Sequence, residues 1–165
     1  MFYGATFAAA VNKKVGMCIG VDDFNEFKDA SLVVIGGIGM RIVTEDQRKH
    51  IHAIAAAHGN GRVLFYEQPS LSVDPALILD KTGGVNVFLY DGDHSKEATI
   101  ENISHYAPCL TDRAVLIVDD YALQEVEQGT QEGIAKAGFK VEDELLFAPC
   151  AGTQYGIYVA IIDRM

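Results

Sequence analysis

The sequence predicts an α/β fold: a doubly wound, mostly parallel Rossmann-like sheet whose last two strands form an antiparallel pair. Short apolar segments alternate with amphipathic helical segments, which is typical of strand–helix–strand units. Two of the apolar segments, 87–90 and 115–118, read as strands that helices cover on both faces. The last two, 139–147 and 155–162, have only a turn between them, which favours antiparallel pairing.

The composition indicates one soluble domain spanning residues 1–165. Of these residues 49% are hydrophobic, which is enough for one core. A formal net charge of −10 without a basic cluster argues against nucleic acid as a partner. No apolar run reaches about 18 residues and no signal peptide is visible, so we expect no membrane insertion. Three cysteines in apolar surroundings indicate buried thiols and a cytoplasmic location.

The first half of the chain contains segments suited to a nucleotide. Gly4 opens an alanine-rich helical segment, and residues 15–21 read as a strand that ends at Asp22. In nucleotide-binding folds a carboxylate at this place accepts ribose hydroxyls, although a simple turn aspartate fits the pattern about as well. Residues 62–66 form the next expected strand, which leads into Glu67.

Two interpretations fit residues 31–43, where an apolar segment leads into three glycines. The glycines form either a loop facing a phosphate or cofactor, or a hairpin in which they serve only backbone geometry. The following helix is expected over 44–58, from a capping box to the residue before a glycine. His50 and His52 lie on different sides of it, so we expect solvated histidines and no shared metal.

The strands expected over 87–90 and 115–118 both end in acidic residues. The polar side chains that follow them are Asp91, Asp93, His94, Asp119 and Asp120. If the strands are parallel neighbours, these side chains meet at one edge of the sheet, where open α/β sheets bind ligands. Adjacent carboxylates at a strand end contribute nothing to packing, which favours a functional role. For the histidine, a local turn hydrogen bond is as consistent as a catalytic role.

Three helices complete the expected elements of the second half. A short helix is expected to begin after Asp74, and Ser95 is expected to cap a longer one that reaches about residue 110. The third is expected over 123–137, weakened by two internal glycines.

The segment from Phe88 to Tyr121, FLYDGDHSKEATIENISHYAPCLTDRAVLIVDDY, resembles the fourth strand, following helix and fifth strand of class I S-adenosylmethionine-dependent methyltransferases. Within that class it is most similar to the small metal-dependent O-methyltransferases of the macrocin and catechol type. GATFAAAV with IGVDDFNEF resembles the family's first helix and second strand, and RVLFYEQPSLSVD its third strand. The chain begins inside the family's first glycine motif, so we expect it to be truncated at the N-terminus.

The resemblance implies S-adenosylmethionine as cofactor and a divalent metal, with Mg²⁺ expected. The residues implied at the cofactor are Gly4, Asp22, Glu67 and Asp91. The implied metal ligands are Asp93, Asp119 and Asp120, and the implied catalytic residues beside the substrate hydroxyl are Asp91 and His94. A hydroxyl is a poor nucleophile until a metal or a base lowers its pKa, which agrees with these roles. The expected substrate is a small hydroxylated molecule.

Departures from the family pattern keep a second hypothesis open. Only Gly4 matches the glycine-rich loop, Pro69 aligns where the family commonly has an acid, and Arg113 with Ala114 replaces a glycine pair. The alternative is a catalytically silent protein of this fold that lacks a complete cofactor loop and acts through assembly. A phosphoacceptor receiver domain is rejected, because its acidic pair follows the first strand, whereas only 45 residues follow Asp120.

The resemblance also implies a sheet without its central strand. Such a sheet would expose hydrogen-bonding edges, so we expect either residues 32–35 to enter it or a second copy of the chain to cover the edge in a homodimer.

Overall fold

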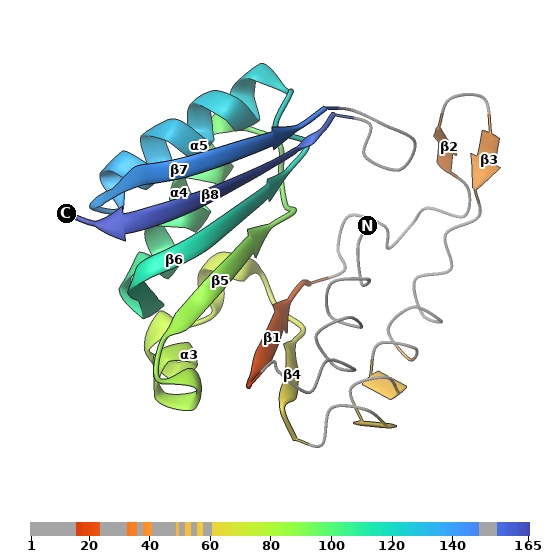
Figure 1. Cartoon of the computed structure of the whole chain (residues 1–165). Coiled ribbons are helices and arrows are strands. Elements are labelled where there is room, and N and C mark those ends of the chain that lie inside the picture. Colours follow the sequence, from red (N-terminus) through yellow and green to blue (C-terminus); the bar gives the residue numbers. More distant parts are fainter. Residues whose placement is uncertain are drawn as a thin grey trace. The chain divides into compact units, whose positions relative to one another are not determined.

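The computed structural model describes residues 16–23, 33–35, 38–40, 49, 52–53, 56–57, 61–148 and 155–165 (Figure 1). The chain divides into two compact units, residues 1–73 and 74–165. The predicted α/β Rossmann-like fold class is confirmed, including the antiparallel pair at the C-terminal end. No helix in the described part of the chain is long and apolar enough to cross a membrane. One domain over 1–165 stays a prediction.

The first unit contains two small sheets. β1 (Cys18–Val21) pairs in parallel with β4 (Val63–Tyr66), and β2 (Val33–Ile35) pairs antiparallel with β3 (Ile38–Met40). Of the two interpretations of residues 31–43, the hairpin is therefore confirmed. Within the described residues β2 has β3 as its strand neighbour, so the expectation that this segment enters a larger sheet is wrong.

Some of the predicted features lie outside the described residues. They are Gly4 and the helix after it, His50, and the turn around 149–153. Of the helix predicted over 44–58, the described positions 49, 52–53 and 56–57 are helical. The 3-10 turn η1 (Ser70–Ser72) follows β4.

The second unit is built on a four-stranded sheet with the order β5-β6-β8-β7. Its strands are β5 (Val85–Tyr90), β6 (Leu110–Asp119), β7 (Phe139–Phe147) and β8 (Ile157–Arg164). β5 and β6 are parallel, and β8 runs antiparallel to both β6 and β7. The predicted neighbours 87–90 and 115–118 pair residue by residue, as expected.

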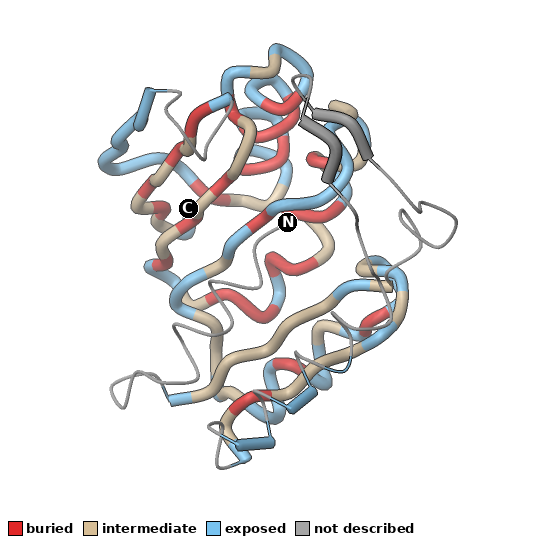
Figure 2. Tube along the Cα trace, turned by 90° about the vertical axis from the view of Figure 1, so that its right-hand side faces the viewer, coloured by how far each residue is buried: buried red, intermediate tan, exposed pale blue. Residues whose placement is uncertain are grey.

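The helices α4 (Lys96–Tyr106) and α5 (Gln124–Lys136) lie against one face of this sheet (Figure 1). Buried and more exposed residues alternate along β8, because successive strand residues point to opposite faces (Figure 2). The core between sheet and helices includes Ile103, Leu116, Val118, Val126, Ile134 and Ile162. The short helix α3 (Pro75–Thr82) begins as predicted, with the Asp74 carboxylate accepting a 2.9 Å hydrogen bond from the Ala76 amide.

The two glycines of α5 allow it to approach α4 closely. A Cβ atom at Gly129 would lie 2.7 Å from Thr99 Cβ and 2.8 Å from the Lys96 carbonyl oxygen. A Cβ atom at Gly133 would lie 3.1 Å from Ile103 Cβ. A glycine lowers helix propensity by about 1 kcal/mol relative to alanine, so the weakness predicted from sequence accompanies a tight helix–helix contact.

α4 ends earlier than predicted. It stops at Tyr106, a 3-10 turn η2 (Ala107–Cys109) follows, and β6 already begins at Leu110. Pro108 accounts for the early end, because proline has no backbone N–H to donate and its ring clashes with the preceding helical turn.

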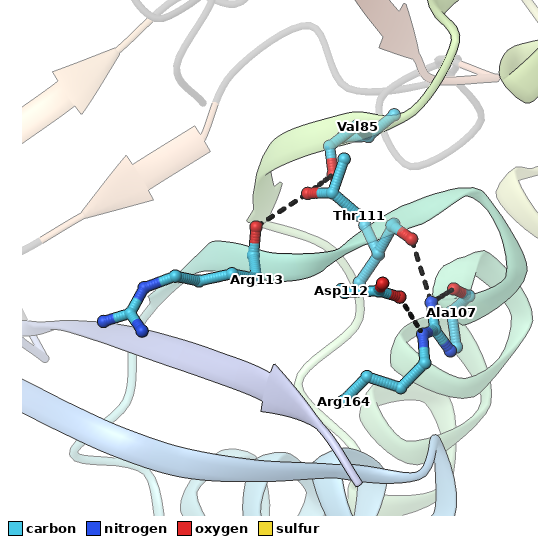
Figure 3. A network of polar contacts seen from close by, with 7 residues as sticks. Val85, Ala107, Thr111, Asp112, Arg113 and Arg164 are labelled. Atoms are coloured by element: carbon cyan, nitrogen blue, oxygen red, sulfur yellow. Dashed lines mark hydrogen bonds and ion pairs between the residues drawn. The ribbon is translucent and has the colours of Figure 1, made fainter.

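The first residues of β6 are irregularly paired. Val85 pairs with Leu110 but Val87 with Val115, so two steps along β5 match five along β6. The Thr111 hydroxyl lies 3.2 Å from the Val85 carbonyl oxygen and 2.7 Å from that of Arg113, linking the two strands (Figure 3).

The Arg164 side chain, at the end of β8, contacts η2 and the start of β6 (Figure 3). Its guanidinium donates hydrogen bonds of 2.9 Å to the Leu110 carbonyl, 3.3 Å to the Ala107 carbonyl and 3.1 Å to the Asp112 carboxylate. The same group lies 4.5 Å from the centre of the Phe139 ring, a cation–π distance.

Candidate active site

The carboxyl ends of β5 and β6 lie at the same edge of the second unit's sheet. The strands are parallel and Tyr90 lies opposite Val118, so Asp91 and Asp119 are the next positions on neighbouring strands. The polar turns after the two strands therefore come together, as predicted from the sequence.

His94 and Asp120 form a close contact between the two turns. His94 Nε2 lies 3.0 Å from Asp120 Oδ2, and the side chains are 50% and 20% exposed. A carboxylate at one ring nitrogen fixes the orientation of an imidazole. Because Nε2 faces Asp120, Nδ1 is the ring nitrogen with which His94 can meet a substrate.

Asp120 has a left-handed backbone, with φ of 54°. Its amide donates a 2.9 Å hydrogen bond to Asp119 Oδ1, and its carbonyl accepts one of 3.0 Å from the Leu123 amide. This region costs an ordinary L-residue about 1 to 2 kcal/mol, and aspartate tolerates it better than most. Residues held in sparsely populated conformations cluster at functional sites.

The edge formed by these turns is electronegative. Partial burial raises the pKa of Asp91, and the nearby Asp119 and Asp120 carboxylates raise it further, whereas His94 lowers it. Burial also raises the pKa of Asp120, with Asp119 adding to the effect. Carboxylates close enough to raise the pKa values of Asp91 and Asp120 favour a proton or a positively charged group in their vicinity.

The Asp93 carboxylate contacts the backbone directly before α4. Its Oδ1 accepts a 2.8 Å hydrogen bond from the Ser95 amide, and hydrogen bonds from Ser95 hold the pKa of Asp93 below its usual value. Ser95 is the N-cap of α4, as predicted, and its hydroxyl oxygen accepts a 3.3 Å hydrogen bond from the Ala98 amide.

The three predicted metal ligands do not fit a metal ion in this arrangement. Within the described residues, no group of three His, Cys, Asp or Glu side chains is placed to hold one. Asp93 accepts from Ser95, an oxygen of Asp119 accepts from a backbone amide, and an oxygen of Asp120 faces the imidazole. The divalent cation implied by the family resemblance is therefore not supported by the donor geometry.

The first unit has its own acidic strand ends. Val21 lies opposite Tyr66 in the parallel β1–β4 pair, and the Asp22 amide donates a 3.1 Å hydrogen bond to the Tyr66 carbonyl. Asp22 and Glu67 therefore follow these strands at one edge. His52 Nε2 contacts the Glu67 carboxylate, and its ring lies edge-on to Phe65 with 5.9 Å between the ring centres.

Sequence reasoning missed the roles of His52 and Tyr90. His52 was expected to be solvated only, but its side chain, although half exposed, also contacts Glu67. Tyr90 is the last residue of β5, and its hydroxyl donates a 2.6 Å hydrogen bond to the Asp93 carbonyl. The signal in the sequence is a tyrosine that ends an apolar strand directly before a polar turn.

Comparison with protein families matches residues 3–121 to a methyltransferase domain. The chain belongs to this methyltransferase domain family. The part of the chain that matches the methyltransferase domain contains both acidic turns of the second unit and ends at Tyr121. A comparison with curated proteins finds no match.

Solved structures of similar fold include two that the chain matches along nearly its whole length. CalS11, a TDP-rhamnose 3'-O-methyltransferase of calicheamicin biosynthesis, is 15% identical with a TM-score of 0.56, over 95% of this chain and 66% of that chain. A proposed O-methyltransferase from Nostoc punctiforme is 13% identical with a TM-score of 0.54, over 94% of this chain and 48% of that chain. The chain thus spans about half to two thirds of the length of these structures, and the likeness shows a shared fold.

Proposed function

We propose that this chain transfers a methyl group from S-adenosylmethionine to a hydroxyl group of a small molecule. His94 is the general base and Asp120 positions it. The observation that carries the proposal is the 3.0 Å contact between His94 Nε2 and Asp120 Oδ2, at the carboxyl ends of parallel strands in a chain of the methyltransferase domain family.

His94 provides an acceptor for the hydroxyl proton. When Nε2–H is donated to Asp120, the lone pair of Nδ1 is available to the substrate. Proton transfer to Nδ1 makes the substrate oxygen a stronger nucleophile, and the Asp120 carboxylate stabilises the imidazolium that forms. General base catalysis of this kind contributes about 10²- to 10⁴-fold to a rate.

The proposed contacts with the cofactor include Asp22, Glu67 and Asp91. When bound, the cofactor supplies a methyl group on a positively charged sulfonium, which departs as a neutral thioether. Asp22 and Glu67 offer acceptor oxygens of the kind that bind ribose hydroxyls, and Asp91 lies at the electronegative edge, which suits a cationic ligand. Gly4 is kept as a proposed cofactor contact.

The remaining parts of the proposal concern the substrate and the assembly. The name of CalS11 refers to a sugar nucleotide, which supports a small hydroxylated substrate for this chain. The homodimer and the cytoplasmic location that we expect from the sequence remain parts of the proposal. No step is derived through a metal, because the predicted ligands do not fit one. Family membership and the base geometry favour an enzyme over a catalytically silent protein that acts through assembly.

The experiment combines binding with turnover. Calorimetry with S-adenosylhomocysteine measures cofactor binding, and transfer of labelled methyl groups to a panel of sugar nucleotides and phenols measures turnover. His94→Gln should keep the affinity and lose about 10²- to 10⁴-fold in turnover, and Asp120→Asn should lose less. His105→Gln, near the end of α4, is the matched control and should behave like the wild type.

Two results would contradict the proposal. One is a wild-type chain that does not bind S-adenosylhomocysteine. The other is a His94→Gln variant as active as the wild type.

A further inference from the structure

The turn that carries His94 is held on both sides of that residue. The Tyr90 hydroxyl donates a 2.6 Å hydrogen bond to the Asp93 carbonyl, which directly precedes His94. The Asp93 carboxylate accepts a 2.8 Å hydrogen bond from the Ser95 amide, which directly follows it. The backbone on either side of His94 is thus fixed, although residues 91–94 are exposed to solvent.

Tyr90 is well placed to fix this turn. Its side chain is buried, with 6% of the residue exposed, and lies beside the Thr99 side chain of α4, whose hydroxyl donates its proton to the Ser95 carbonyl. The turn passes directly over the ring: a Cβ atom at Gly92 would lie 3.0 Å from Tyr90 Cε2 and 3.3 Å from its hydroxyl oxygen. Tyr90 therefore touches the strand, the turn and the helix that together frame the site.

The hydroxyl remains a donor at neutral pH. Burial raises the pKa of Tyr90 to about 12, and the negative charge of Asp93 also raises it. The phenol therefore keeps its proton and donates a hydrogen bond to the Asp93 carbonyl. Loss of this hydrogen bond would give the peptide before His94 more freedom.

We propose that Tyr90 is a positioning residue for His94, whose hydroxyl holds the 91–95 turn in the conformation in which the imidazole faces Asp120. The expected loss of turnover rests on the proposed function, whereas the expected change in the conformation of the turn does not. A phenylalanine would keep the buried ring and remove only the hydrogen bond, so the role of the hydroxyl can be separated from that of the packing.

The test compares Tyr90→Phe with Tyr158→Phe. Tyr158 is a close match, because it is also buried, with 4% exposed, and its hydroxyl donates a hydrogen bond of the same 2.6 Å length, to Glu144. The readouts are kcat and the KM for S-adenosylmethionine, the exchange rate of the Ser95 amide, and the ¹⁵N signals of the His94 ring.

We expect Tyr90→Phe to lower kcat about tenfold at unchanged KM, to speed Ser95 exchange about tenfold and to shift the His94 ring signals. Tyr158→Phe should change none of these. If the wild type transfers no methyl group, the proposed function fails, and exchange and ring signals still decide the role of Tyr90. The inference is overturned if Tyr90→Phe matches the wild type in exchange and ring signals, if kcat is unchanged in an active enzyme, or if both variants respond alike.

Discussion

Asp91 and Asp93 are two residues apart but respond oppositely to their surroundings. The pKa of Asp91 is raised by partial burial and by the Asp119 and Asp120 carboxylates, whereas the pKa of Asp93 is lowered by hydrogen bonds from Ser95. Because the folded-state pKa of Asp91 is raised, its protonated carboxyl group stabilises the fold below the usual pKa of 3.8. This stabilisation is lost as the pH rises through the raised pKa. A lowered pKa adds stability above 3.8, which is lost as the pH falls.

These opposite shifts predict opposite effects of removing the charge. Asp91→Asn should raise the melting temperature at pH 7, because it relieves repulsion, and the gain should shrink as the pH falls toward 4. Asp93→Asn should lower the melting temperature at pH 7, since a favourable hydrogen bond to a charged oxygen is lost. Thermal melts between pH 4 and pH 8 measure both. A loss of stability in Asp91→Asn at neutral pH would contradict the assignment.

The sequence could predict which residues follow the strands but not which way each side chain turns. Strand ends are visible because the apolar runs stop abruptly before Asp91 and Asp119. Within a turn, however, a spacing of two does not determine direction, and a local amide competes for each carboxylate. Asp93 was therefore expected at a metal, although its carboxylate accepts a hydrogen bond from the Ser95 amide. Tyr90 was overlooked, because its role depends on a backbone carbonyl three residues later.

At the scale of the elements, the contact between α4 and α5 depends on the absence of a side chain at Gly129. Gly129→Ala should gain about 1 kcal/mol in helix propensity but lose about 1 to 3 kcal/mol by overpacking against Thr99 and the Lys96 carbonyl. We expect net destabilisation in urea unfolding. Gln128→Ala, on the exposed side of the same helix, should be nearly neutral. A Gly129→Ala variant more stable than the wild type would contradict the close approach.

Arg164 joins the last strand to the start of β6. Arg164→Ala removes hydrogen bonds to two backbone carbonyls and the contact with the Phe139 ring, and should lower the free energy of unfolding by about 1 to 3 kcal/mol. Arg113→Ala is the matched control. The Arg113 side chain is 62% exposed and forms a single ion pair, with Asp163 at 3.3 Å, so its loss should cost less than about 1 kcal/mol. Equal losses would contradict the role of Arg164.

The elements that were predicted best have a clear period and clear end signals. The strands β5 and β6 and the helix α5 are of this kind, and the helix ends before Gly138 as expected. The end of α4 was misplaced, because apolar residues continue at helical spacing past Pro108. The hairpin of β2 and β3 stayed ambiguous, since a glycine cluster serves a turn and a ligand loop equally well.

At the scale of the whole molecule, we predict one cooperative unfolding transition. The described sheets of the first unit have two strands each, and two-stranded sheets are at most marginally stable alone. Unit 1 should therefore not persist once the rest of the chain unfolds, and residues 1–165 should behave as one domain. Calorimetry should give equal calorimetric and van't Hoff enthalpies. Two separate transitions would contradict this prediction.

The irregular pairing at the start of β6 determines the register of this strand at its other end. It sets how many residues separate Leu110 from the position where Val115 meets Val87, and hence which residue of β6 arrives beside Asp91. One residue advances a strand by about 3.3 Å and turns every later side chain to the opposite face. An insertion beside Thr111 that the irregular stretch did not absorb would therefore move Asp120 away from His94, although it lies at the far end of the strand. The distance between His94 and Asp120 thus depends partly on the number of residues at the start of β6.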